Sequence, residues 1–334
     1  MSQTVHIAIL VIPGAALSAV HGLIDLFQTA NRVLAELQQA PALRFQESCW
    51  NLEGGRLVPS PTGSDGAPAV VIVPPVLNGQ AYLEPQPDVC AWLKTWHQQG
   101  AVVSSACAGS FLLAQAGLLT GRKATTHWQL EGAFRYQYPD IELDTDALLL
   151  TDSDLVTAGG VMSWVDLGLH LIGRYVPPTV VQALGRFLVV DTGARQQSYY
   201  RSFLPVLDHN DRAILALQHR LHREYAQAWS VRQMASMASL TERTFSRRFL
   251  KATGLRPAEY LQQQRVHKAR ELLENTATTV ERVAWLVGYE DISAFRRMFQ
   301  KQTGLTPSQY RERFSNSGQA VNRERAEVAT VELD

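Results

Sequence analysis

Short apolar runs alternate with longer segments of helical spacing over the first half of the chain. Apolar and β-branched runs predict strands at 5–12, 69–73, 101–104, 148–151 and 155–158. Apolar positions at helical spacing predict helices at 17–37, 89–99, 108–116 and 161–175. Strands that alternate with helices indicate a parallel sheet covered on both faces. The turn residues at 152–154 predict that the last two strands form a hairpin.

The second half reads differently, because residues 211–314 carry helical spacing almost without interruption. Residues 186–211 connect the two halves, and their polar stretch 195–200 is expected to be exposed. We predict a domain at 1–190, a linker at 191–210, an all-α domain at 211–314 and a flexible tail at 315–334. The predicted fold class is α/β followed by an all-α domain.

A frame of nine residues occurs twice in the second half, fifty positions apart. The shared residues are Phe245/Phe295, Arg247/Arg297, Phe249/Phe299, Lys251/Lys301, Thr253/Thr303, Gly254/Gly304, Leu255/Leu305, Pro257/Pro307 and Tyr260/Tyr310. A repeat with a fixed offset indicates one supersecondary unit that is used twice.

Local chemistry indicates that each copy is a helix-turn-helix. Ser230 and Gln233 form a capping box before a short helix. Thr241 in the first copy and Asp291 in the second can cap the helix that follows the turn. The glycine after each threonine ends that helix, and the proline that follows suits the start of the next.

Charge separates the two halves, although the chain as a whole is neutral. Residues 1–185 hold 8 Lys/Arg against 15 Asp/Glu, a net charge of −7, whereas residues 209–315 hold 18 against 10, a net charge of +8. This asymmetry favours a polyanionic partner for the basic half. The alternative is two unlike surfaces without such a partner.

Double-stranded DNA is the partner that two helix-turn-helix units suggest. The major groove admits one helix and presents a donor and acceptor code on its base edges. Two recognition helices one DNA turn apart, about 34 Å, would contact successive grooves. Any one arginine can instead belong to a solvated helix face.

Residues 211–314 resemble the DNA-binding domain of the AraC/XylS family. The resemblance is carried by VAWLVGY at 283–289, FRRMFQK at 295–301 and GLTPSQYR at 304–311. It implies that bases are contacted by Arg243, Ser246 and Arg247 of the first recognition helix and by Ser293, Arg296 and Arg297 of the second.

Cys107 is the candidate chemical group of the first half. It lies between a predicted strand and helix, and the small residues of SSACAG at 104–109 permit a sharp turn of the nucleophile-elbow kind. A helix that begins after the cysteine is expected to lower the pKa of its thiol. His127 lies where it can return to the same sheet edge, and a Cys–His pair is the minimum for thiol catalysis.

The first half resembles the PfpI/ThiJ-like, class I glutamine amidotransferase-like fold, a flavodoxin-like sandwich, in its GlxA-type AraC-regulator form. The resemblance is carried by VIPG at 11–14, the Cys107 turn, LLAQAGLL at 112–119, GRKATTHW at 121–128 and TAGG at 157–160 with Asp166. It implies a homodimer and a small-molecule effector of unknown identity, with Gly14, Cys107, Ala108, His127 and Trp128 at the ligand site.

One departure from this family disfavours catalysis. Its enzymes often place a carboxylate from the first helix beside the cysteine, and here Ala19 holds that place while Asp25 lies two turns later. We therefore predict no catalytic residue, with Cys107 and His127 as degenerate candidates. A cysteine hydrolase or amidase, or a redox sensor that uses Cys107, remains the alternative.

Other candidate sites have simpler interpretations. Trp50, Trp128 and Trp164 can line an aromatic cage for a cationic amine, but core positions are the more common role. Asp166 and His170, four residues apart on one helix, are interpreted as a surface or interface pair. We predict no metal and no cofactor.

The predicted function is sequence-specific transcription regulation, activation more than repression, with RNA polymerase as a partner of an activator. The three cysteines form no disulfide framework or metal-ligand spacing. We expect no signal peptide, no apolar run near the roughly 20 residues that span a bilayer, and a cytoplasmic location.

Overall fold

The computed structural model describes residues 3–37, 43–53, 56–60, 66–77, 82–193 and 195–315. The chain divides into two compact units, Met1–Gln197 and Ser198–Asp334. This division falls within the linker predicted at 191–210. The predicted tail lies outside the described residues except for Ser315.

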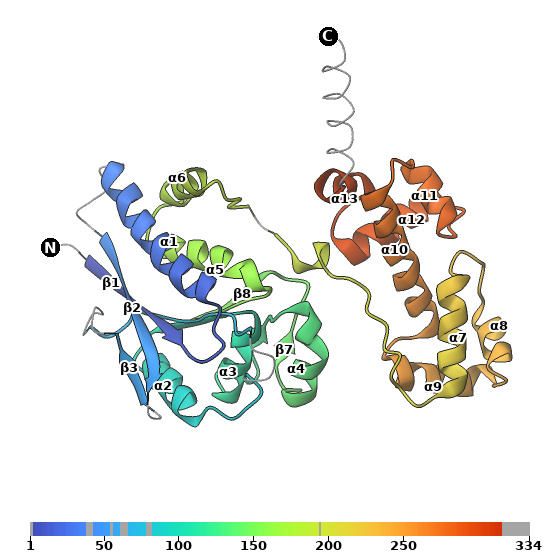
Figure 1. Ribbon diagram of the computed structural model, residues 1–334, viewed down its shortest axis with the longest axis horizontal. Coiled ribbons are helices and arrows are strands. Elements are labelled where there is room, and N and C mark those ends of the chain that lie inside the picture. Colours follow the sequence, from blue (N-terminus) through green and yellow to red (C-terminus); the bar gives the residue numbers. More distant parts are fainter. Residues whose placement is uncertain are drawn as a thin grey trace, which may run out of the picture. The chain divides into compact units, whose positions relative to one another are not determined.

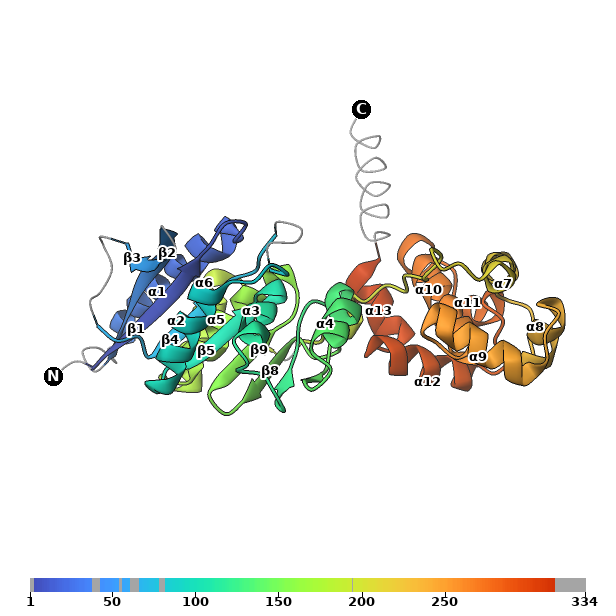
Figure 2. The ribbon, with the colours of Figure 1, turned by 90° about the horizontal axis from the view of Figure 1, so that it is seen from below.

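A seven-stranded sheet lies at the centre of the described part of the N-terminal unit, in the order β3-β2-β1-β4-β5-β9-β8. The strands are β1 Gln3–Val11, β2 Leu43–Glu53, β3 Arg56–Pro59, β4 Val70–Val73, β5 Val102–Ala106, β8 Leu149–Asp152 and β9 Leu155–Ala158. The pairs from β2 through β1, β4 and β5 to β9 are parallel, and β3 and β8 join antiparallel at the edges. In Figure 2 the strands β1, β4, β5, β9 and β8 follow one another from left to right.

Helices cover both faces of this sheet (Figures 1 and 2). One face packs against α1 Leu17–Glu36, α5 Trp164–Gly173 and α6 Pro178–Leu188, and the other against α2 Pro87–Gln98, α3 Ser110–Gln115 and α4 Glu131–Gln137. Every residue of β4 and β5 is buried, as expected for strands covered on both sides. The predicted α/β fold is confirmed, and so is the hairpin of β8 and β9.

Sequence patterns missed several elements of this unit. β2 breaks its polar and apolar alternation at residues 46–48, α4 has only 7 residues, and α6 begins after the last predicted helix and runs into the part of the chain assigned to the connection. A small parallel pair, β6 Lys123–Ala124 and β7 Glu142–Leu143, was also missed. The helix predicted at 161–175 begins with the 3₁₀ turn Val161–Ser163 after Gly160, whose φ of 92° is a glycine conformation.

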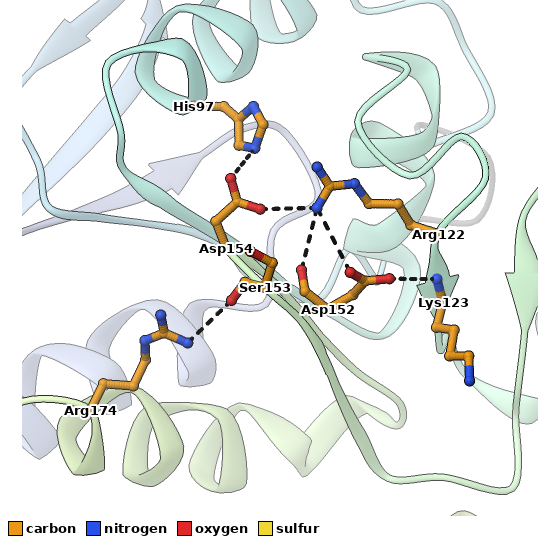
Figure 3. A network of polar contacts seen from close by, with 7 residues as sticks. All are labelled: His97, Arg122, Lys123, Asp152, Ser153, Asp154 and Arg174. Carbon is orange, nitrogen blue, oxygen red and sulfur yellow. Dashed lines mark hydrogen bonds and ion pairs between the residues drawn. The ribbon is translucent and has the colours of Figure 1, made fainter.

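Polar contacts fix the turn of the β8–β9 hairpin (Figure 3). The carboxylate of Asp154 lies 2.7 Å from His97 Nε2 and accepts a hydrogen bond from Arg122 at 3.0 Å. Ser153 has a left-handed φ of 59°, and its carbonyl accepts from Arg174 at 3.5 Å. The turn is thus bonded to α2, to the segment after α3 and to the end of α5.

Helices make up nearly all of the described C-terminal unit. They are α7 Arg212–Arg223, α8 Val231–Met237, α9 Glu242–Thr253, α10 Pro257–Asn275, α11 Val280–Leu286, α12 Ile292–Thr303 and α13 Pro307–Phe314. Two separate cores form, one around Phe245, Phe249 and Tyr260 and the other around Phe295, Phe299 and Tyr310. The long helix α10 contacts α9 on one side and α11, α12 and α13 on the other, so it joins the two cores (Figure 1).

Residues 198–209, here called the connecting segment, pack on these helices. The buried Arg270 of α10 donates to the carbonyl of Ser198 at 3.0 Å and to that of Arg201. The buried Gln218 of α7 donates to the carbonyl of Val206 at 3.0 Å. Because Arg270 lies beside the second core and Gln218 in the first, the segment is attached along both halves of the unit.

Candidate nucleic-acid interface and ligand pocket

The first helix-turn-helix consists of α8 and α9. Ser230 and Gln233 form the predicted capping box, and the Thr241 side chain accepts from the Thr244 amide. Between the helices, Ser239 has a left-handed φ of 56° and the Leu240 amide donates to the Ala235 carbonyl at 3.0 Å. The turn is therefore closed by backbone bonds.

The second helix-turn-helix, α11 and α12, repeats this construction. Asp291 accepts from the Ser293 amide at 2.7 Å, so it caps α12 as predicted. Gly288 has a φ of 86°, and the Tyr289 amide donates to the Ala284 carbonyl at 2.9 Å. The short helices correspond at an offset of 49 and the recognition helices at 50, so the second turn is one residue longer.

Identical contacts explain the shared frame of the two copies. Thr253 donates to the carbonyl of Phe249 at 2.8 Å, and Thr303 donates to that of Phe299 at 2.8 Å. The second phenylalanine of each copy meets its tyrosine at a ring-centroid distance of 5.3 Å and a near-perpendicular angle. The same residues thus end each recognition helix and pack it against the next one.

The predicted base-contacting residues all lie away from the cores, on α9 and α12. Arg243 and Arg247 are exposed on α9, and Ser246 is half-buried. On α12, Ser293, Arg296 and Arg297 are exposed. Within the described residues, no ion pair involves Arg243, Arg247 or Arg297.

Arg296 differs from those three arginines because it is paired. Its guanidinium lies 3.0 Å from the carboxylate of Glu281, which belongs to the first turn of α11. Sequence reasoning missed Glu281. An alignment of the short helices at offset 49 would have drawn attention to it, because that alignment places Glu281 opposite Arg232. Another missed pair, Arg248 and Asp211 at 2.7 Å, ties α9 to the cap of α7.

A pocket of 220 Å³ opens at the carboxyl ends of the parallel strands in the N-terminal unit. It is lined by Val76, Leu77, Tyr82, Cys107, Ala108, His127, Gln129, Leu130 and Val161. Val76 follows β4, Cys107 follows β5 and Val161 follows β9. This edge is where open parallel sheets bind their ligands.

Cys107 lies on the predicted sharp turn. Its φ of 54° is left-handed, which is rare for a residue other than glycine, and its carbonyl accepts from Thr126 at 3.0 Å and from Ser110 at 3.1 Å. The side chain is almost fully buried. The bond from Thr126 ties the turn to the segment that carries His127.

Burial disfavours the charged form of both Cys107 and His127. Burial raises the pKa of the Cys107 thiol to about 11, although the Ala108 backbone amide acts in the opposite direction. The predicted lowering of this pKa is therefore wrong, because loss of hydration outweighs the amide. Burial lowers the pKa of His127, whose Nδ1 accepts from the Gln129 amide at 3.1 Å. Within the described residues, no hydrogen bond joins Cys107 to His127.

Two predicted ligand residues lie outside the lining of this pocket. Trp128 stacks on His127 at 5.6 Å, and its amide donates to Gln197 at 3.3 Å. The carbonyl of Gly14 accepts from the amide of Leu77 at 2.7 Å, so Gly14 supports the rim.

The exposure predicted for residues 195–200 is wrong for Gln197 and Ser198, which are buried. Gln197 donates to the carbonyls of Thr126 and Ala147 at 2.9 and 3.0 Å, which replaces the hydration that it loses. Its position supports the backbone around His127.

The described lining of the pocket holds no carboxylate. Ala19 is fully buried in α1, and Asp25 is exposed. Trp50 and Trp164 do not share an aromatic cage, because Trp50 packs against Trp92 on one face of the sheet while Trp164 packs against the core on the other, as the core interpretation expects.

A second cavity of 630 Å³ lies beside α5 and α6. Asp166 there pairs with Arg195 rather than with His170, whose ring nitrogen lies 3.1 Å from the Thr151 hydroxyl. The two helix residues thus face separate partners.

Comparison with known proteins assigns both units. The DJ-1/PfpI family matches residues 7–174, half of the chain. The chain belongs to the DJ-1/PfpI family. A helix-turn-helix domain matches residues 234–313. Among the helices of the described residues, none combines the length and the apolar character needed to cross a bilayer.

Several relatives join the same two domains. The HTH-type transcriptional regulator CdhR of Pseudomonas aeruginosa is 27% identical over 310 residues, 90% of each chain. The HTH-type transcriptional regulator GbdR of the same species is 25% identical over 79% of this chain and 71% of its own. The crystal structure of Drosophila melanogaster DJ-1beta covers 57% of this chain and 100% of that chain, with 19% identity and a TM-score of 0.44.

This DJ-1/PfpI family member therefore carries an AraC-type helix-turn-helix region, and the predicted resemblance is confirmed. The combination is that of helix-turn-helix transcription regulators, which agrees with the predicted general function.

Proposed function

We propose that this regulator contacts base edges through the exposed residues of α9 and α12. The observation that carries the proposal is the doubled construction, in which identical packing leaves an exposed arginine-bearing face on each recognition helix. Arg243 and Arg247 act from α9 and Arg297 from α12, with Ser246, Ser293 and Arg296 beside them. Bidentate contact with guanine is the role that arginine most often has in the major groove.

The net charge of +8 over residues 209–315 supports binding to the phosphate backbone. Helix N-termini add backbone amides that attract phosphate. Contacts of this kind set affinity and register, and the base contacts select the sequence.

The effector is proposed to bind in the Cys107 pocket. Because the thiol and the imidazole are both uncharged near neutral pH, the described lining favours a small molecule with an apolar part and one or two hydrogen-bonding groups. Effector binding regulates the protein only if one domain arrangement binds it more tightly. We further propose a cytoplasmic homodimer that activates transcription through RNA polymerase.

Arg297→Ala tests the DNA-binding proposal. Selection from a random duplex library should first yield a preferred sequence for the full chain. The variant should then lose about 1–3 kcal/mol on that sequence and relax the preference at one base pair. Equal weakening on every duplex would make Arg297 a phosphate contact, and failure to select any sequence would contradict the proposal.

A cysteine hydrolase is the second candidate, favoured by the strained backbone at Cys107 and by His127 in the same pocket. The raised pKa of the thiol and the lack of a carboxylate in the described lining count against it. Oxidation of Cys107 is a related alternative, which Cys107→Ser with unchanged regulation under peroxide would exclude.

A further inference from the structure

One predicted base-contacting arginine is held by a carboxylate. The guanidinium of Arg296 and the carboxylate of Glu281 are 3.0 Å apart, and their side chains are 55% and 63% exposed. On α12, the exposed residues Ser293, Arg296, Arg297, Gln300 and Lys301 recur at helical spacing, so they share one face. Glu281 borders that face because it reaches Arg296.

The first helix-turn-helix is an internal comparison. Its short helix aligns with α11 at an offset of 49, so Arg232 corresponds to Glu281, and its recognition helix aligns at 50, so Ser246 corresponds to Arg296. Arg232 is exposed. The first helix-turn-helix therefore carries one positive charge at this place, and the second carries a neutral ion pair at the corresponding place. The fold does not require Glu281.

We propose that Glu281 is a specificity-determining residue that positions Arg296 and withholds it from DNA phosphates. This inference rests on the proposed function of α12. A carboxylate at the edge of a DNA-facing surface repels phosphate and competes with it for the guanidinium. On an arbitrary sequence, Arg296 stays with Glu281 and adds little affinity.

The cognate sequence changes this balance. An exposed ion pair is weak, with a median contribution of about 0–1 kcal/mol, whereas a bidentate contact with a base discriminates by about 1–3 kcal/mol. The contact with Glu281 uses only Nη2 of Arg296, so the other guanidinium N–H groups can contact a matching base while the pair with Glu281 stays intact. Glu281 lowers binding to other sequences more than binding to the cognate one, which is specificity through a repulsive element.

Glu281→Gln in the full chain tests this inference. Glu312→Gln is the matched control, because Glu312 is an exposed residue of α13 in the same unit and its substitution changes the net charge equally. Affinities are measured for the selected duplex and for a scrambled duplex at one salt concentration. Glu281→Gln should reduce the ratio of the two affinities by about two- to five-fold, the range that an exposed ion pair supports, mainly through tighter binding to the scrambled duplex. Glu312→Gln should leave the ratio unchanged.

A second pair of variants separates positioning from a general charge effect. With Arg296→Ala in place, adding Glu281→Gln should leave the affinity ratio unchanged, because no guanidinium remains to be held. The inference would be overturned if Glu281→Gln reduced the affinity ratio equally with and without Arg296. It would also be overturned if Glu281→Gln alone left the affinity ratio unchanged. Both results presuppose a selected sequence, so they differ from failure of the proposed function, in which no sequence is selected.

Discussion

At the scale of single residues, the Cys107 pocket is organised to stay uncharged. The thiol is buried and the imidazole is half-buried, so loss of hydration penalises thiolate and imidazolium alike. Cys107 has a left-handed backbone and lines the pocket. These features suit the recognition of a ligand better than nucleophilic attack.

The pH dependence of alkylation at Cys107 tests this assignment. Because the folded pKa is about 11, above the ordinary value of 9.0, the iodoacetamide reaction should be slow at neutral pH and accelerate towards pH 11. The folded state holds this proton more tightly, so the associated stability is fully present below pH 9.0 and is lost as pH rises towards 11. Peptide-resolved mass spectrometry distinguishes Cys107 from Cys49 and Cys90. A midpoint below about 7 would support the hydrolase instead.

At the scale of elements, the second helix-turn-helix depends on its turn. Gly288 has a φ of 86°, and a Cβ at that position would lie 2.3 Å from the Ala226 carbonyl oxygen. Ala226 belongs to the loop between α7 and α8, so the turn of the second copy packs closely against the loop that precedes the first copy. Ser239 tolerates the corresponding left-handed conformation in the first copy.

Gly288→Ala should therefore destabilise the C-terminal unit by more than Gly254→Ala. Both positions are left-handed, which costs a residue with a Cβ about 1–2 kcal/mol, but a Cβ at Gly254 would meet open space. Urea unfolding of the two full-length variants measures the difference. Equal losses would show that the contact with Ala226 relaxes freely.

At the scale of the whole molecule, charge and chemistry are divided between the two units. The acidic N-terminal region contains the uncharged pocket, and the basic C-terminal region contains both recognition helices. The connecting segment is bonded to Arg270 and Gln218 of the helical unit. A conformational change in the N-terminal unit would therefore reach the connecting segment, which is hydrogen-bonded to both halves of the helical unit.

This division of charge predicts the salt response of the full chain. The logarithm of the association constant for the selected duplex should fall linearly with the logarithm of salt concentration, because each neutralised phosphate releases counterions. Fluorescence anisotropy at several salt concentrations measures the slope. A flat response would contradict phosphate binding by the basic region.

Local signals account for most of the predicted fold. The β5–Cys107–α3 turn, the β8–β9 hairpin and both helix caps followed from neighbouring residues. β2 was missed because its alternation of polar and apolar residues breaks at 46–48 and at 49–50, so the segment carries no clear strand pattern. The burial of Gln197 was also missed, because its partners Thr126 and Ala147 are distant in sequence.

The sequence by itself determined the two kinds of domain and the doubled recognition unit, because hydrophobic periodicity and a repeated frame are properties of the chain. Only the tertiary structure decided that the Cys107 thiol holds its proton and that Arg296 is paired with Glu281. Both depend on distances and hydration that arise when separate elements pack together, and residue spacing does not encode either quantity.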